Sequence, residues 1–135
     1  MLYLIIGLPG GGKTTLSKEL LKIDPDGSVH DDFIPHIFNG KLVADLHNGK
    51  NVFAPDPRLC KIESCESTIM KINQFVKNVD ITLVLFPNNS VKALKQAKYR
   101  QEFENGKNVD NAIEFYSKIY NPSGYEKFGY RVVYL

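Results

Sequence analysis

Residues 7–14 read GLPGGGKT, and this stretch decides the fold of the chain. It matches the pattern G-x-x-x-x-G-K-[ST] at every fixed position. Glycine loses more conformational entropy on folding than any other residue, so four glycines in eight positions need a reason other than stability. Glycine also lets consecutive backbone N–H groups turn toward one anion, and the stretch therefore predicts a phosphate-binding loop.

The residues on either side of this loop predict a strand before it and a helix after it. Leu2–Ile6 is apolar at consecutive positions, as expected for a parallel strand that is covered on both faces. Residues 14–23 carry leucines at helical spacing, and Pro25 closes the helix. A strand, a glycine-rich loop and a helix in this order are the context that the pattern requires. We expect the positive end of the helix dipole to face the same phosphates.

Strands and helices alternate along the rest of the chain. Further strands are predicted at 27–33, 51–54, 80–86 and 130–135, and helices at 35–48, 58–77, 90–104 and 110–120, with a turn at 121–124. This alternation predicts an α/β fold in which helices flank a mostly parallel five-stranded sheet. No internal repeat or linker divides the sequence, so we expect residues 1–135 to form one domain.

The composition restricts the partners and the compartment. The 17 basic and 15 acidic side chains nearly balance, which argues against a large surface for a phosphate backbone. The first apolar run is too short for a signal peptide, and no segment approaches the roughly 20 apolar residues that span a bilayer. Cys60 and Cys65 suit two reduced thiols better than a disulfide framework. We expect a cytoplasmic protein without a membrane partner.

The glycine-rich loop predicts that ATP and Mg²⁺ bind together. Lys13 is placed to reach the β- and γ-phosphates, and the Thr14 hydroxyl suits a magnesium ligand. The residues expected to contact the nucleotide are Gly7, Pro9, Gly10, Gly11, Gly12, Lys13, Thr14 and Thr15. A tight strand-to-helix turn formed by chance is the alternative, and the motif together with its context argues against it.

With these motifs in place, the sequence resembles the P-loop kinases, and within them the polynucleotide kinase-like group that includes zeta-toxin-type small kinases. The resemblance covers nearly the whole chain and is carried by GLPGGGKTT at 7–15, HDDF at 30–33, VFAPDPRL at 52–59 and LKQAKYRQEFENGKNV at 94–109. It implies the three-layer sandwich of P-loop NTPases, with a helical lid at about residues 90–120. It also implies transfer of the γ-phosphoryl group of ATP to a hydroxyl acceptor.

Two adjacent carboxylates at the end of the second predicted strand are candidates for acceptor chemistry. A kinase of this class needs a carboxylate there to orient the accepting hydroxyl and to take its proton. The resemblance gives this catalytic role to Asp31, the first residue of an Asp-Asp-aromatic triplet. Asp32 is then expected near the substrate, where it supports magnesium through water or faces a helix dipole. Carboxylates at such junctions are also common turn residues.

Asp56 and Arg58 follow the third predicted strand. The resemblance places a polar residue near the acceptor or magnesium at the position of Asp56, and Arg58 suits an acidic acceptor. Both are therefore candidate substrate-binding residues. The prolines on either side of Asp56 support a structural turn almost equally well, and Arg58 then points to solvent.

The predicted lid carries one arginine that matches the family pattern. Arg100 takes the place of the second of two lid arginines, which stabilise charge on the transferring phosphoryl group. Gln96 stands at the first position, so one expected cation is missing. Lys95, Lys98 or Lys107 can supply charge there, but a lysine lacks the bidentate fork of arginine. A solvated helix face is the alternative for all of these residues.

The acceptor is not specified by these residues. The resemblance suggests a nucleic-acid 5′ hydroxyl, a DNA base hydroxyl, a nucleoside or a similar small molecule. Small kinases of this kind are frequent in phage genomes, and a phage-encoded enzyme is expected in the host cytoplasm. A nucleoside monophosphate kinase is one alternative, although only Arg58 lies between residues 30 and 60 where such enzymes carry paired arginines. A nucleotide-binding switch without transferase activity is the other, because Phe86 is followed by proline and asparagine and not by an acidic residue.

Overall fold

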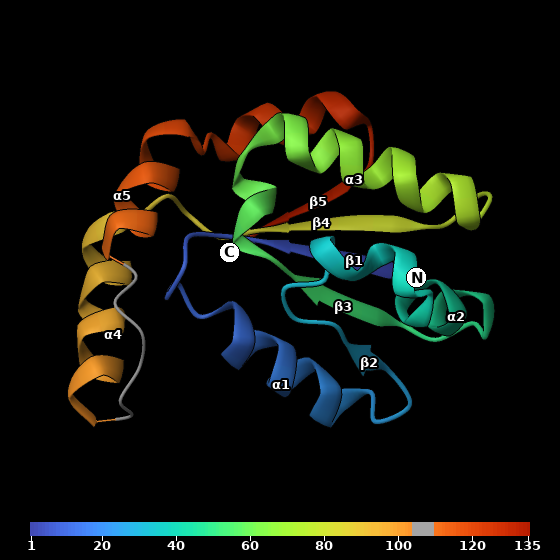
Figure 1. Cartoon of the computed structure of the whole chain (residues 1–135), viewed down its shortest axis with the longest axis horizontal. Helices are drawn as coiled ribbons and strands as arrows, with labels where there is room; N and C mark the ends of the chain where they lie inside the picture. Colours follow the sequence, from blue (N-terminus) through green and yellow to red (C-terminus); the bar gives the residue numbers. More distant parts are fainter. Residues whose placement is uncertain (104–109) are drawn as a thin grey trace.

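The computed structural model describes the backbone of residues 1–103 and 110–135, and the side chains of all of these but 38–39 and 100–103. One five-stranded sheet runs through it in the order β2-β3-β1-β4-β5, and every strand pair is parallel (Figure 1). The strands are β1 (Leu2–Ile6), β2 (Ser28–Val29), β3 (Val52–Pro55), β4 (Ile81–Leu85) and β5 (Arg131–Tyr134). The predicted α/β fold class is confirmed.

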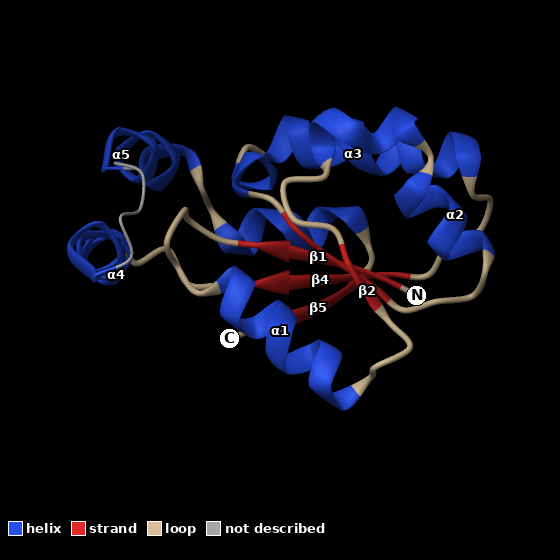
Figure 2. Cartoon of the chain, turned by 60° about the horizontal axis from the view of Figure 1, so that its bottom comes forward, coloured by secondary structure: helices blue, strands red, loops and turns tan. Residues whose placement is uncertain are grey.

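The central strand β1 supplies side chains to two separate apolar layers. Leu4 and its alternate neighbours enter the larger core, whereas Ile5 enters a smaller one with Phe53 and Val84. This alternation follows from the period of two in a strand. Helices cover both layers: α1 (Lys13–Ile23) lies on the side of the smaller core, and α3 (Ile62–Phe75) on the other (Figure 2).

Local backbone geometry moves several predicted boundaries. The other helices are α2 (Lys41–His47), α4 (Ser90–Phe103) and α5 (Asp110–Ile119), with the 3₁₀ helices η1 (Ile34–Asn39), η2 (Pro57–Cys60) and η3 (Pro122–Phe128). The helix expected at 58–77 is split into η2 and α3 because Lys61 is extended. The turn expected at 121–124 continues as η3, and β2 is shorter than expected. None of the described helices is both long and apolar enough to cross a membrane.

The helices α4 and α5 form a hairpin that stands beside the sheet and not on one of its faces (Figures 1 and 2). The start of α4 and the end of α5 are joined where the hairpin meets the sheet, and we call this junction the root of the hairpin. The side-chain amide of Asn88 donates to the carbonyls of Ser117 (2.8 Å) and Tyr120 (2.9 Å). The Tyr120 hydroxyl donates to the Phe86 carbonyl at 2.6 Å, with the Ile6 carbonyl 3.4 Å away. The hairpin is therefore attached to the carboxyl ends of β1 and β4.

The larger core gives a prediction for stability. Leu83 is fully buried on β4, between β1 and β5, so Leu83→Ala leaves a cavity in the sheet layer. We expect the free energy of unfolding in urea to fall by about 2–5 kcal/mol. Ile23→Ala is the matched control, because 82% of Ile23 is exposed and the change should stay within about 0.5 kcal/mol. Equal losses for both variants would contradict this assignment of the core.

Candidate functional site

The loop between β1 and α1 has a shape that strongly favours glycine. Gly10 and Gly12 have φ values of +75° and +104°, in the region that other L-residues rarely adopt. A Cβ at Gly11 would lie 2.9 Å from the Leu8 carbonyl oxygen. Among the described residues, no side chain caps the first turn of α1, which also holds no acidic residue. The backbone N–H groups and the positive end of the dipole are therefore open to an anion.

Lys13 places its ammonium group inside this loop. Its Nζ donates to the carbonyls of Gly7 and Leu8, both at 2.8 Å, and the residue is only 7% exposed. Burial lowers the pKa of Lys13 from its ordinary value, while the neighbouring carboxylates of Asp31, Asp32 and Asp56 act in the opposite direction. The loop thus holds a cation at the place where the phosphates are expected.

The first predicted catalytic carboxylate lies beside the predicted magnesium ligand. The Thr14 hydroxyl donates to Asp31 Oδ2 at 3.3 Å, across 17 positions of sequence. The backbone of β2 makes this possible, because the N–H groups of His30 and Asp32 donate to carbonyls of β3 and its end at 3.0 Å. Parallel strands end at the same edge of a sheet, so Asp31 arrives next to the loop that follows β1. Asp32 has a φ of +49° at the turn after it.

A histidine and a carboxylate that the sequence did not single out anchor this strand end. His30 Nε2 lies 2.8 Å from Asp45 Oδ2 on α2 and 3.3 Å from the Ser28 hydroxyl. Both the His30 and the Asp45 side chains are mostly buried. Burial raises the pKa of Asp45, but the hydrogen bonds from His30 and Ser28 outweigh it and hold that pKa below its usual range. Asp31 is therefore preceded by a residue that is fixed to a second helix.

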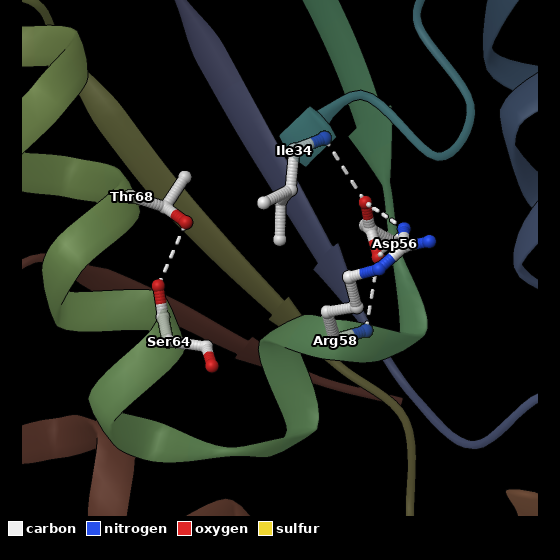
Figure 3. A network of polar contacts seen from close by, with 5 residues as sticks. All are labelled: Ile34, Asp56, Arg58, Ser64 and Thr68. Atoms are coloured by element: carbon white, nitrogen blue, oxygen red, sulfur yellow. Dashed lines mark hydrogen bonds and ion pairs between the residues drawn. The ribbon is translucent and has the colours of Figure 1, made fainter. Parts of the chain in front are cut away.

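Asp56 is fully buried at the end of β3, and its carboxylate is shared among several donors (Figure 3). Oδ2 accepts from the Ile34 N–H at 3.1 Å, and Oδ1 from the Arg58 N–H at 2.9 Å. Arg58 Nη1 lies 3.2 Å from both oxygens. Burial raises the pKa of Asp56, and the hydrogen bonds partly offset it. The residue joins the end of β3 to η1 and orients Arg58.

The remaining predicted residues lie on the loop and on α4. Pro9 and Thr14 are partly exposed, and Thr15 is exposed on the first turn of α1. Arg100 lies on α4, but its side chain, like residue Lys107, falls outside the described part of the chain. Gln96 Oε1 is buried and has no hydrogen-bond partner among the described residues. Lys95 and Lys98 are exposed on the same helix.

The two cysteines are confirmed as free and buried. Burial raises the pKa of both thiols to about 12, so both stay protonated at neutral pH. Cys60 lies close to Gly7 of the glycine-rich loop, and the backbone N–H of Gly7 opposes part of the rise in the Cys60 pKa. Among the described residues, no group of three or more His, Cys, Asp or Glu side chains is arranged to hold a metal ion.

A glycine-rich loop between β1 and α1, at the carboxyl ends of a parallel sheet of this order, defines the P-loop kinase fold. A fungal RNA kinase has this fold, with a TM-score of 0.66 and 17% sequence identity. The match covers 99% of this chain, and this chain spans only 37% of the length of the RNA kinase. A gluconokinase from Sinorhizobium meliloti has a TM-score of 0.56 and 10% identity, covering 98% of this chain and 80% of its own. Deoxyadenosine kinase from M. mycoides has a TM-score of 0.53 and 15% identity, and the match covers 100% of this chain and 89% of the deoxyadenosine kinase.

The chain belongs to the same family as the uncharacterized protein R277 of Acanthamoeba polyphaga mimivirus. The two sequences are 31% identical over 131 residues, which cover 97% of this chain and 94% of the viral protein. No protein-family model matches the chain. Its sequence relationship is thus to a viral protein, and its fold is that of the P-loop kinases.

The buried carboxylate gives a second prediction for stability. Asp56→Ala removes the acceptor of the Ile34 and Arg58 N–H groups, and we expect the free energy of unfolding to fall by about 1–3 kcal/mol. Asp26→Ala removes an exposed carboxylate and should change it by less than about 0.5 kcal/mol. Urea unfolding of both variants measures the difference. An Asp56→Ala variant as stable as the control would show that these bonds are dispensable.

The contact between His30 and Asp45 gives a pH-dependent prediction. Because the pKa of Asp45 is depressed in the folded state, its contribution is complete above its unfolded pKa of about 3.9 and is lost as pH falls through the folded value. We expect Asp45→Asn to lower the free energy of unfolding at pH 7. The difference in this free energy between the variant and the wild type should narrow below about pH 4. Urea unfolding at pH 7, 5 and 3 measures it. A gap that is constant across this range would contradict the assignment.

Proposed function

We propose that this protein is an ATP-dependent phosphotransferase that moves the γ-phosphoryl group to a hydroxyl acceptor. The contact between Thr14 and Asp31 carries this proposal, because it brings a carboxylate to the mouth of a loop suited to phosphate. A phosphate-binding loop alone serves switches and motors equally well. A carboxylate at its mouth adds the group that phosphoryl transfer to a hydroxyl requires. The kinase fold of the solved neighbours supports the same reading.

The nucleotide is assigned to the loop and the first turn of α1. Free backbone N–H groups of the loop and of the first turn of α1 surround the phosphates, with Lys13 Nζ exchanging its two carbonyl partners for phosphate oxygens. Oxygen donors fit Mg²⁺, and the Thr14 hydroxyl on the first turn of α1 is the donor assigned to it. When bound, Mg²⁺ neutralises charge on the phosphates.

Asp31 is proposed to orient the acceptor hydroxyl and to take its proton. As the hydroxyl oxygen bonds to the γ-phosphorus, the bond from that phosphorus to the β–γ bridging oxygen breaks and ADP leaves. The proton passes to the Asp31 carboxylate. Its neighbour Asp32, on the turn at the end of β2, is assigned to the substrate side of the site. The anchoring of His30 to Asp45 limits the positions that the Asp31 backbone can adopt.

The hairpin of α4 and α5 is proposed as the lid, at about residues 90–120 of a single domain that spans 1–135. Its attachment at the ends of β1 and β4 places its root beside the glycine-rich loop. Arg100 is assigned to the γ-phosphate, where a guanidinium stabilises charge in transfer. Closure of such a lid excludes water and limits ATP hydrolysis. Gln96 stands at the first of the two positions where the resembled kinases have lid arginines, so less charge is supplied from this helix.

The acceptor is assigned to hydroxyl compounds of nucleotide size or to nucleic-acid ends. The solved neighbours of this fold include an RNA kinase, a gluconokinase and a deoxyadenosine kinase, so a 5′ hydroxyl, a DNA base hydroxyl and a nucleoside all stay within the proposal. Free buried thiols are typical of a reducing compartment. Together with the mimivirus relative, they support a virus-encoded enzyme that works in the host cytoplasm.

Transfer of label from γ-labelled ATP tests the proposal. The panel contains 5′-hydroxyl oligonucleotides, nucleosides and nucleoside monophosphates with Mg²⁺. We expect Asp31→Asn to lower transfer by at least about 100-fold while ATP binding persists. The reason is that the substitution removes the base that takes the acceptor proton and leaves the nucleotide-binding loop intact. Lys13→Ala should weaken both transfer and binding. The control Asp26→Asn, at an exposed position away from the loop, should leave both unchanged.

Three outcomes would overturn the proposal in different ways. Tight ATP binding without transfer to any acceptor would indicate a nucleotide-binding switch. Transfer to the phosphate group of monophosphates, with no transfer to any hydroxyl, would indicate a nucleoside monophosphate kinase. Calorimetry without affinity for any purine nucleotide, with Mg²⁺ present, would remove the loop from nucleotide binding altogether.

A further inference from the structure

Arg58 is held at the mouth of the candidate site in a fixed orientation. Its guanidinium lies along the Asp56 carboxylate, with Nη1 at 3.2 Å from both oxygens (Figure 3). That carboxylate is itself fully buried and fixed by the N–H groups of Ile34 and Arg58. An arginine whose partner cannot move has lost much of its rotamer freedom before any ligand arrives.

The opposite edge of the guanidinium is open. The Arg58 side chain is 45% exposed, whereas the Asp56 side chain is fully buried. Neither Nε nor Nη2 makes a hydrogen bond to any described residue, so the donors on that edge are available. Two parallel N–H groups in one plane match the oxygens of a phosphate or a carboxylate.

Stability alone gives little reason for this guanidinium. Backbone N–H groups already satisfy both oxygens of Asp56, one each. An ion pair with a half-exposed partner adds little to folding, because water screens it. The burial of Asp56 also raises its pKa, which shows that the pairing does not fully compensate for desolvation. A role toward a ligand accounts for the arrangement better.

Arg58 lies at the edge of the sheet that carries the glycine-rich loop, and beside the hairpin of α4 and α5. It follows β3, which lies between β1 and β2 in the sheet, so it shares the edge that carries Lys13 and Asp31. The helix α5 contacts η2, the short helix that carries Arg58. The charge of Arg58 also reaches the Tyr116 hydroxyl of α5: burial raises the pKa of Tyr116, and Arg58 opposes that rise. Arg58 thus lies between the end of the sheet and α5.

We infer that Arg58 binds an anionic group of the acceptor, so that the acceptor is a hydroxyl compound that also carries a phosphate or a carboxylate. This inference rests on the proposed phosphotransferase function and narrows its substrate class. Asp56 is then a positioning residue that acts through Arg58 and does not touch the acceptor. Neutral nucleosides and sugars bind without this contact and are poorer acceptors.

Binding to matched acceptor pairs tests the inference without requiring turnover. The protein is saturated with magnesium and the β,γ-imido analogue of ATP, so that the glycine-rich loop is filled, and each acceptor is titrated by calorimetry. The pairs are a nucleoside 3′-monophosphate with its nucleoside, and gluconate with glucose. We expect one anionic member to bind about 10- to 100-fold more tightly than its neutral partner, as a charge-assisted contact provides. The two pairs distinguish phosphate from carboxylate.

The variants separate recognition from folding. Arg58→Gln should remove the preference for the anionic member and leave affinity for the neutral member and for ATP unchanged. Arg58→Lys keeps a cation beside Asp56 but loses the fork, and should recover only part of the preference. Arg131→Gln, at an exposed position on β5, is the matched control and should behave as wild type. In turnover, the Arg58→Gln defect should appear in KM for the anionic acceptor and not in KM for ATP.

The wild-type titration decides the inference by itself. If neither anionic member binds more tightly than its neutral partner, Arg58 is only a structural contact and the inference is wrong, whether or not the variants fold. A preference that survives in Arg58→Gln overturns it equally. Efficient transfer to a neutral acceptor with no anion preference would refute the inference but keep the kinase. Anion preference without transfer to any acceptor would refute the kinase but keep the binding site.

Discussion

The backbone conformation of Gly10 and Gly12 is the constraint on which the rest of the candidate site depends. Positive φ values at both positions turn the chain sharply between β1 and α1. That turn lets α1 start with uncapped N–H groups and brings Lys13 back onto the carbonyls of Gly7 and Leu8. A residue with a Cβ at either glycine would strain the turn and move the ammonium and the helix end together. Anion binding and local fold are therefore one property of this loop.

The parallel register of the sheet carries that property to the neighbouring strands. Pairing of β3 with both β1 and β2 brings three strand ends to one edge. Each end contributes a different group: Lys13 after β1, Asp31 after β2 and Arg58 after β3. The strand β2 is only two residues long, so its position depends on contacts beyond its ladder. The side chains of His30 and Asp45 supply one of them, which explains a buried polar pair away from the loop.

Much of the fold could be predicted because its signals are local. The apolar runs of β1 and β4 and the glycine pattern between β1 and α1 each lie within a few residues. The split between η2 and α3 could not be predicted, because it depends on the extended backbone of Lys61 within an otherwise helical pattern. The contact of His30 with Asp45 joins residues 15 positions apart through the packing of α2. No periodicity in the sequence marks such a pair.

Part of the candidate site could also be predicted from the sequence. The loop pattern predicts Thr14 and the family resemblance predicts Asp31, and the structure brings the two side chains into contact. For Asp56 the sequence left a turn and a substrate contact open. Its burial and its backbone donors show that it shapes the end of β3, whatever it does for a substrate. Sequence shows which residues carry charge, but burial decides which of them are free to meet a ligand.

The root of the hairpin shows how the loop and the helices beside it are coupled. Tyr120 donates to the Phe86 carbonyl at the end of β4 and lies near the Ile6 carbonyl, one residue before the glycine-rich loop. Asn88 binds the last carbonyls of the returning chain, so both legs of the hairpin meet at one fixed point. A rotation of α4 and α5 must therefore pivot next to Gly7, where a Cβ would already lie 2.9 Å from Phe86 Cβ. Such close packing transmits small shifts instead of absorbing them, because dense interiors have little free volume. The hairpin and the phosphate-binding loop are thus joined mechanically through the ends of β1 and β4.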